Sequence, residues 1–281
     1  MTENPLVSII TPVLNGIKFL EPCLHSVLNQ SYPHIEHIFV DGGSTDGTLE
    51  VLARYQAKYP DRIRFISEPE SGPESAWNKG LRLAKGEIFG WLGADDTYEL
   101  GTIQIIVEFF KANPEAYFVF GGGNLINEKG EIIRSTPYKK DFDLKEAIND
   151  KCEIPATSAF YRREVIDKVG FINTSTRISE LDFWIRVGKV FRIYRIDGIL
   201  SNFRMHKDSF SGSIEAGRAY YRDGFRISRR YGGSIFSPRA RRCLRFVILD
   251  GLRLYPLINK VLRRGRLGNE KVRLSCEKQN R

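Results

Sequence analysis

The chain has 281 residues, of which 42% are hydrophobic, 27% charged and 12% aromatic. These proportions are those of a globular protein, and they exclude a disordered or collagen-like chain. The four cysteines lie far apart without a CxxC pair, which excludes a disulfide scaffold and predicts a reducing, cytoplasmic setting. We find no secretory signal and no apolar run of about 18 residues, so we expect no membrane-spanning helix.

The net charge of +9 is unevenly distributed along the chain. Residues 214–281 contain 18 Lys and Arg against 5 Asp and Glu, whereas residues 1–213 contain 25 against 29. A basic tail on a mildly acidic body is not the pattern of a nucleic-acid-binding domain, in which basic residues are spread over the fold. We therefore expect no nucleic acid partner, and an anion-seeking role for the tail alone.

The first 120 residues alternate short apolar runs with amphipathic helical patterns. Strands are predicted at 6–11, 35–40, 63–66 and 88–92, and helices at 17–30, 45–59 and 73–84. This alternation predicts an α/β fold, in which a mostly parallel sheet carries helices on both faces. Ligands of such sheets bind beyond the carboxyl ends of the strands, so the loops there are the candidate site.

The second half is less regular. A hairpin is predicted at 125–134 with its turn at 127–130, followed by a strand at 158–161 and a short helix that ends at 169. A helix at 182–190 and two short strands at 192–196 and 199–203 come next. From about residue 214 the pattern is basic and helical.

Two adjacent carboxylates, Asp95 and Asp96, follow the fourth predicted strand. Carboxylates at a strand end suit a hard divalent cation such as Mg²⁺ or Mn²⁺, which shares substrate phosphate oxygens. The alternative is that Asp96 caps the next helix. His206 follows the last predicted strand, and it is either a packed histidine or a ligand to metal or phosphate oxygens.

Asp41 follows the second strand and opens the loop Asp41-Gly-Gly-Ser-Thr-Asp46-Gly47. Its carboxylate is placed to accept hydrogen bonds from a base or a ribose, while the glycines allow close approach of a ligand. Asp46 is interpreted as a helix cap. The loop has neither a P-loop lysine nor a GxGxxG motif, which argues against an ATPase and a nicotinamide dehydrogenase.

Glu180 and Asp182 precede the predicted helix at 182–190. A carboxylate there acts either as a general base or as a first-turn charge favoured by the helix dipole. The residues alone do not separate these alternatives.

Six segments in order resemble the family 2 glycosyltransferases, which have the GT-A fold. Within the family, the resemblance is to the bacterial enzymes that build O-antigen, capsule and exopolysaccharide. The matching segments are Val7–Asn15, Asp41–Thr48, Ser71–Gly80, Trp91–Asp96, Glu180–Arg186 and Phe203–Ser211. The resemblance implies a catalytic domain over residues 1–212, with a nucleotide-binding half (1–97) and an acceptor-side half (98–212). Residues 213–281 would form a basic helical extension.

The resemblance also implies roles for single residues on the donor side. Pro12 and Asn15 would line the nucleotide pocket, and Asp41 would contact the base. Three further residues match the segment that closes over the ribose and diphosphate: Gly72, Asn78 and Lys79.

The remaining implied roles concern metal and catalysis. Asp95 matches the second carboxylate of the DxD metal motif, and His206 matches a late histidine near the metal and the diphosphate. Asp96 would lie close to the donor sugar. Glu180 matches the catalytic base.

Two positions depart from the family pattern. The first DxD position is Gly93, so Asp95 would hold Mn²⁺ or Mg²⁺ with the diphosphate, water and His206. The base position carries Glu180 where Asp is usual, and a displacement of about 1 Å costs on the order of 100-fold in rate. Asp182 is therefore kept as a second candidate base.

The expected function is inverting transfer of a sugar from a nucleoside diphosphate donor, most simply a UDP-sugar, to a saccharide or lipid-linked saccharide. The alternative, suggested by Gly93, is a nucleotide-sugar-binding protein with a degenerate, inactive site. In the tail, residues 239–266 combine apolar and basic positions at helical spacing. This pattern predicts either a helix lying on the anionic inner face of a membrane or one that packs on the body.

Overall fold

The computed structural model describes residues 1–137, 140–152, 154–176, 178–206 and 214–251. Within these ranges a nine-stranded sheet runs through the molecule in the order β3-β2-β1-β4-β8-β6-β9-β5, with β7 beside β6. The first four strands are parallel: β1 (Val7–Val13), β2 (Ile35–Asp41), β3 (Ile63–Ser67) and β4 (Ile88–Trp91). The helices between them are α1 (Ile17–Leu28), α2 (Thr48–Lys58) and α3 (Pro73–Leu83). The predicted α/β class is confirmed.

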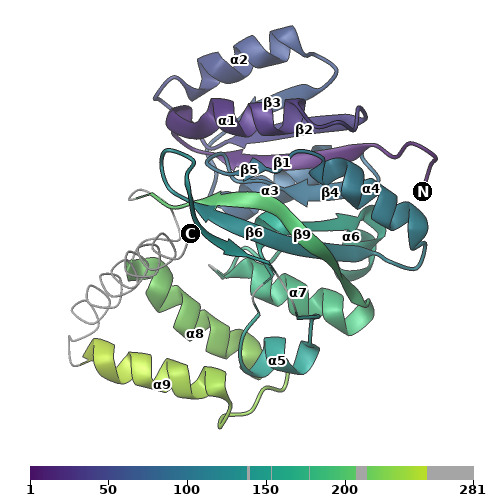
Figure 1. Ribbon diagram of the computed structural model, residues 1–281. Helices are drawn as coiled ribbons and strands as arrows, with labels where there is room; N and C mark the ends of the chain where they lie inside the picture. The colour runs from purple at the N-terminus through teal and green to yellow at the C-terminus, as the bar shows by residue number, and fades with distance from the viewer. Residues whose placement is uncertain (138–139, 153, 177, 207–213, 252–281) are drawn as a thin grey trace, which may run out of the picture.

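Both faces of the sheet are covered by helices (Figure 1). Ile9 and Ile10 are adjacent in β1, point to opposite faces and are both fully buried. Ile9 belongs to a core shared with α1 and α4 (Thr102–Ala112), and Ile10 to one shared with α3, α6 (Arg163–Val169) and α7 (Ser179–Val190). Burial on both faces explains why the strand is mostly apolar and does not alternate between apolar and polar residues.

The second half of the sheet mixes strand directions. β6 (Phe118–Ile126) pairs in antiparallel fashion with β7 (Ile132–Thr136) and β8 (Ala159–Arg162), and in parallel with β9 (Ile193–Arg204). The β6–β7 hairpin and its turn are confirmed, with Gly130 in the left-handed region at φ 85°. The short β5 (Thr97–Tyr98) was not predicted and pairs with β9. The short α5 (Leu144–Asn149) and a 3₁₀ turn (Ala156–Ser158) complete this half.

One prediction in this half is wrong: the two short strands at 192–196 and 199–203 are the single strand β9. Asp197 and Gly198 lie between the two predicted strands. In the structure Gly198 has φ 129°, and the register against β6 shifts near this point, so the glycine takes up an irregularity within one strand. The helix predicted at 182–190 begins earlier, at Ser179, which places Glu180 in its first turn.

The C-terminal part contains α8 (Ile214–Arg230) and α9 (Pro238–Gly251), which lie side by side at the end of the molecule away from α2 (Figure 1). They contact α5, and α8 also contacts α7. The helix predicted at 239–266 begins at Pro238, and its residues 252–266 lie outside the described part of the chain. In the described part, no helix combines the length and apolar character needed to span a bilayer.

Candidate active site

The carboxyl ends of the parallel strands meet at one edge of the sheet, as expected. Asp41 at the end of β2 is paired with Val13 at the end of β1 and with Ser67 at the end of β3. Trp91, the last residue of β4, pairs with Ile10 of β1. The loops after all four strands therefore leave the sheet on the same side. We call this edge the rim.

Asp41 is completely buried at the rim, and both carboxylate oxygens accept hydrogen bonds. Oδ2 accepts from the backbone N–H groups of Gly43 and Ser44, at 2.9 and 3.0 Å, and from the Ser67 hydroxyl at 2.7 Å. Oδ1 accepts from the Ser44 hydroxyl. Burial opposes ionisation, but these hydrogen bonds outweigh it and hold the pKa of Asp41 below its ordinary value. The residue is thus a fixed anion.

Asn15 connects the loops after β1 and β2. It has a positive φ of 50°, and its side-chain oxygen accepts a hydrogen bond from the Thr45 backbone N–H at 2.9 Å. Its own N–H donates to the Ser44 hydroxyl at 2.7 Å. Pro12 is half-buried in β1, opposite Val40 of β2. Pro12, Asn15 and Asp41 therefore line one continuous stretch of the rim.

Asp95 and His206 lie in direct contact beside this stretch. His206 Nε2 is 2.9 Å from Asp95 Oδ2, and the two side chains are 12% and 32% exposed. The His206 ring also packs on Phe19 of α1, with ring centroids 5.0 Å apart. Residues separated by more than a hundred positions thus form a single accessible pair, as the sequence suggested.

Asp96 faces inward and is only 2% exposed. Its Oδ1 accepts a hydrogen bond from the Arg204 backbone N–H at 2.8 Å. Burial and the neighbouring Asp95 raise the pKa of Asp96 well above its ordinary value, despite the opposing effect of Arg204. Asp96 thus fixes the loop that carries Asp95, and it caps no helix in this structure.

Arg204 is a rim residue that sequence reasoning passed over. Its Nε donates to the Asp95 backbone carbonyl at 2.7 Å, and its Nη1 donates to the carbonyls of Asn127 and Glu128 in the β6–β7 turn. The guanidinium also lies 4.8 Å from the Phe19 ring centroid. Its only sequence signal is its position two residues before His206.

The space around Gly93 is tight, and a side chain there would displace neighbouring carboxylates. A Cβ there would lie 2.7 Å from Asp96 Oδ2 and 2.8 Å from Asp95 Oδ1, closer than real Cβ atoms come to their neighbours. Its carbonyl accepts a weak hydrogen bond from the buried Cys23 thiol, with S and O 3.4 Å apart. The missing first carboxylate of the DxD pattern therefore reflects a loop in which two carboxylates already fill that space.

The rim suits a metal bound jointly by protein and substrate. Among the described residues, no three His, Cys, Asp or Glu side chains gather as a cation site. Asp95 and His206 supply one carboxylate and one imidazole, a pair that suits Mn²⁺ or Mg²⁺ when phosphate oxygens and water complete the coordination. The chemistry of these two residues fits such an ion.

Glu180 lies in the first turn of α7 and is half-buried. Burial raises the pKa of its carboxyl to about 6, and the negative charge of Glu74 contributes in the same direction. Glu74 is in the first turn of α3, directly after the loop that follows β3. Glu180 therefore approaches the rim from the second half of the chain, with a pKa suited to a general base near neutral pH.

Asp182 is on a different face of α7 and is 2% exposed. It accepts hydrogen bonds from Arg186 Nε and the Tyr231 hydroxyl, both at 2.9 Å, and its Oδ1 lies 3.4 Å from Arg230 Nη1. Its carboxylate raises the pKa of Tyr231 to about 12, after the larger effect of burial. The geometry thus gives Asp182 the task of linking α7 to α8.

The three residues expected near the ribose and diphosphate lie on or before α3. Gly72 precedes the helix at φ 153°, a conformation that L side chains rarely adopt. The Asn78 amide is buried and exchanges hydrogen bonds of 2.8 and 3.0 Å with the backbone of Ile172. Lys79 Nζ pairs with Glu68 Oε2 at 2.8 Å and with Glu70, and these carboxylates raise its pKa. The Asn78 amide is thus engaged by the backbone of Ile172, and Lys79 by two carboxylates of the loop that follows β3.

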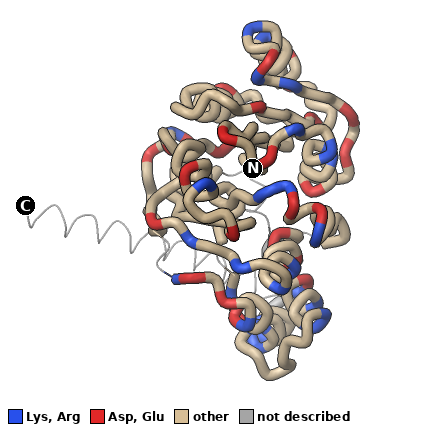
Figure 2. Tube along the Cα trace, turned by 90° about the vertical axis from the view of Figure 1, so that its right-hand side faces the viewer, with Lys and Arg blue, Asp and Glu red and all other residues tan. Residues whose placement is uncertain are grey.

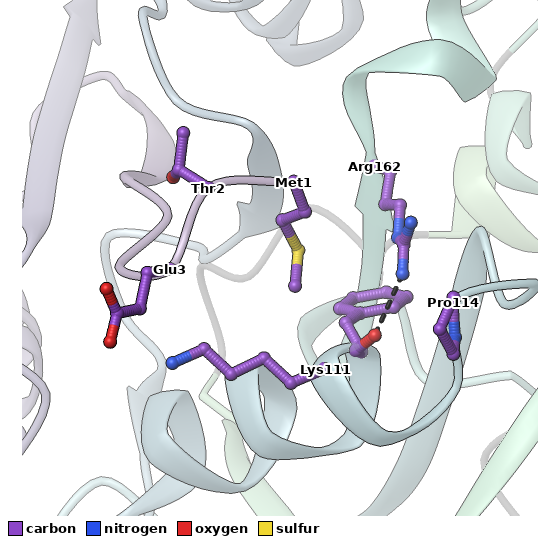
Figure 3. A pocket seen from close by; sticks show the side chains of 7 residues that line it. Met1, Thr2, Glu3, Lys111, Pro114 and Arg162 are labelled. Carbon is purple, nitrogen blue, oxygen red and sulfur yellow. Dashed lines mark hydrogen bonds between the residues drawn. The ribbon is translucent and has the colours of Figure 1, made fainter.

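A separate cavity of about 320 Å³ is lined in part by Arg162 (Figure 3). Arg162 pairs with Ile88, the first residue of β4, so the cavity lies at the amino end of that strand. Met1, Glu3 and Lys111 also line it. It contains no residue that the sequence singled out, and it is at the edge of the sheet opposite the rim.

Comparison with known proteins agrees with this geometry. The family model described as glycosyl transferase family 2 matches residues 8–170. A Bacillus subtilis protein named as a teichuronic acid biosynthesis glycosyltransferase, TuaG, is 32% identical over 217 residues, which cover 75% of this chain and 83% of that one. Escherichia coli chondroitin synthase is 29% identical over 207 residues, covering 74% of this chain but 30% of the synthase.

Solved structures show the same fold at low sequence identity. S. aureus TarS 1-349 in complex with UDP-GlcNAc has a TM-score of 0.62 and 17% identity, over 79% of this chain and 64% of that one. The Pyrobaculum calidifontis mannosyltransferase PcManGT, in complex with GDP-Man and Mn²⁺, has a TM-score of 0.60 and 20% identity, over 96% and 87% of the two chains. The family match covers more than half of the sequence, and the chain therefore belongs to the family 2 glycosyltransferases and has the GT-A fold.

Proposed function

We propose that the protein transfers a sugar, with inversion at the anomeric carbon, from a nucleoside diphosphate donor to a hydroxyl of a saccharide or lipid-linked saccharide. The observation that carries this proposal is the rim. It joins a fixed anion for the nucleoside at Asp41, the accessible Asp95–His206 pair, and a carboxyl of raised pKa at Glu180. The similarity to TuaG and to chondroitin synthase supports a role in bacterial surface polysaccharide synthesis.

In this mechanism Asp41, whose oxygens accept hydrogen bonds from Gly43, Ser44 and Ser67, fixes the loop against which the base or the ribose binds. Asp95 and His206 would hold a divalent ion, which would offset the charge that develops on the leaving nucleoside diphosphate. Glu180 takes the proton from the acceptor hydroxyl. The acceptor oxygen then bonds to the anomeric carbon as the bond to the diphosphate breaks on the opposite face. Asp182, which is held by Arg186 and Tyr231, takes no part in proton transfer.

We propose a UDP-sugar as the donor, with a GDP-sugar as the competing choice. TarS binds UDP-GlcNAc and PcManGT binds GDP-Man with Mn²⁺, each on this fold.

The Gly93 position also keeps a second function open, namely a nucleotide-sugar-binding protein without turnover. The observation that favours this second function is the DxD loop, in which a carboxylate side chain at position 93 would collide with those of Asp95 and Asp96.

The first test is thermal unfolding with UDP, GDP, dTDP and CMP, each with and without Mn²⁺. A ligand at about 100 times its dissociation constant adds roughly 2.7 kcal/mol of stability. We expect a Mn²⁺-dependent shift with UDP that is lost in Asp95→Ala. The matched control is Asp61→Ala, which removes an exposed carboxylate remote from the rim. No shift with any nucleotide would refute the donor site.

The second test separates transfer from binding. Slow hydrolysis of a donor sugar to free nucleoside diphosphate needs no identified acceptor, because water can replace the acceptor hydroxyl. We expect UDP release from UDP-sugars by the wild type and none by Glu180→Gln. Nucleotide binding with no release from any donor would favour the inactive binding protein.

A further inference from the structure

Helix α9 has two apolar faces, and one of them is used inside the protein. Ala240, Cys243 and Phe246 are buried, and Phe246 stacks on Tyr221 of α8 with ring centroids 5.0 Å apart. At the base of this face, Arg239 Nη2 donates to the Ala147 carbonyl of α5 at 2.9 Å. The packing of α9 on the body is therefore complete without its other face.

The other face exposes large apolar side chains. Leu244, Val247 and Ile248 are 61%, 50% and 50% exposed, and Leu244 and Ile248 are four residues apart on one stripe of the helix. The loop that leads into α9 adds Ile235 and Phe236, which are 56% and 80% exposed. Five such residues fall within fourteen positions, a local concentration of exposed apolar side chains that we call the patch.

This patch is also cationic. Arg241 and Arg245 are exposed and interleave with Leu244 and Ile248 at helical spacing. The sequence from 234 to 249 contains no Asp or Glu. Figure 2 shows basic positions along this end of the molecule, at the opposite end from α2. Apolar side chains among exposed cations fit a surface that is both anionic and able to accept apolar groups.

We propose that Ile235, Phe236 and the outer stripe of α9 (Arg241, Leu244, Arg245, Val247, Ile248) dock on an anionic lipid bilayer. Phe236 and Leu244 enter the boundary between headgroups and acyl chains, while the two arginines contact lipid phosphates. Binding does not require the transfer reaction. The purpose of membrane binding, which is to bring a lipid-linked acceptor within reach of Glu180, does rest on the proposed function.

The link to the base is physical. Glu180 is in the first turn of α7, and Asp182 of the same helix bonds to Tyr231 at the end of α8. Because α9 packs on α8, the docking patch and the base belong to one packed unit. A bilayer that holds α9 therefore holds α7 at a fixed height above the lipid phosphates.

Two other occupants are disfavoured by charge. A symmetric second copy would place Arg241 and Arg245 near their own equivalents. The segment 252–281 carries nine Lys and Arg against two Asp and Glu, so it too would oppose the basic stripe with like charge. An anionic bilayer is the occupant that complements both the apolar and the basic residues.

The test is flotation of the full chain with vesicles of phosphatidylcholine alone or with added phosphatidylglycerol. We expect binding to the anionic vesicles only, weakened by salt. The variant Phe236→Ser/Leu244→Gln should bind roughly tenfold or more weakly, and Arg241→Gln/Arg245→Gln should lose the preference for phosphatidylglycerol. The controls are Leu100→Gln, which removes a side chain 76% exposed elsewhere, and Arg54→Gln/Lys58→Gln, which removes an equivalent pair on α2.

Wild type that does not bind anionic vesicles, or patch variants that bind as the wild type does, would overturn the proposal. So would a wild-type dimer that the patch variants convert to monomer, because the patch would then be an interface between copies. Every variant is also checked for its melting temperature and its nucleotide-induced shift. Loss of vesicle binding with an intact nucleotide shift separates failure of the patch from failure of the donor site.

Discussion

Replacing Glu180 with Gln is expected to abolish transfer and, at the same time, to stabilise the protein. Burial and the charge of Glu74 raise the pKa of Glu180 to about 6, against an ordinary value of 4.5. The folded state therefore disfavours the ionised carboxylate, which is the form that takes a proton from the acceptor. Glutamine has the same shape and no charge, so it removes both the base and the cost of burying the charge.

The difference between a pKa of about 6 in the folded protein and the ordinary 4.5 corresponds to at most about 2 kcal/mol. Glu180 is partly exposed, and solvent screening reduces the expected gain to about 1 kcal/mol. For a domain of this size that gain raises the melting temperature by about 2–4 °C. Because the raised pKa penalises only the ionised form, the gain is full above about pH 6 and disappears below about pH 4.5.

The assay is thermal unfolding of wild type and Glu180→Gln at a series of pH values, beside donor hydrolysis near neutral pH. The control is Asp182→Asn, which weakens the bonds to Arg186 and Tyr231 and should lower the melting temperature. If Glu180→Gln kept its activity, Glu180 would not be the base. If it melted at the same temperature as the wild type at every pH, the buried charge inferred here would be refuted.

Three further predictions concern the surroundings of the site. Glu74→Gln removes a negative charge near Glu180, so the acid limb of the kcat/KM–pH profile should move to lower pH. Gly93→Asp restores the DxD pattern but should weaken Mn²⁺-dependent nucleotide binding in the thermal assay and cost about 1–3 kcal/mol of stability, because its Cβ has no room. Tyr231→Phe leaves buried Asp182 without one hydrogen bond and should cost about 1–2 kcal/mol in urea unfolding, with the pH profile unchanged.

The parallel half of the sheet was predictable because its signal is local. A strand buried on both faces, such as β1, is mostly apolar rather than alternating, as Ile9 and Ile10 show, although Ser8 and Thr11 are buried polar exceptions. The rim followed from the same logic, since parallel neighbours end on one side. That argument places Asp41 beside Val13 and Ser67 without any knowledge of side-chain contacts.

The choice between Glu180 and Asp182 could not be made from the sequence. Both precede the same helical pattern, and either residue type can serve as a base. The structure gives the two carboxyls different surroundings, since the Tyr231 hydroxyl, 49 positions away, bonds to Asp182, and our proposal of Glu180 as the base rests on this difference. Such a contact cannot be predicted from the local sequence, because nothing around Tyr231 indicates which carboxylate its hydroxyl contacts. The same holds for Asn78, whose partner Ile172 is 94 positions distant.

The Asp95–His206 pair shows how the two halves of the chain build one site. Thr97 and Tyr98, directly after the two aspartates, form β5 and pair with Asn202 and Ser201 of β9. This short antiparallel pairing, absent from the prediction, sets the end of β9 beside the DxD loop. Arg204 then bonds to the Asp95 carbonyl, and His206, two residues further, reaches the Asp95 carboxylate at 2.9 Å. The register of β9 in the sheet thus sets the position of His206 beside Asp95. Two independent short strands in place of β9 would not determine that position.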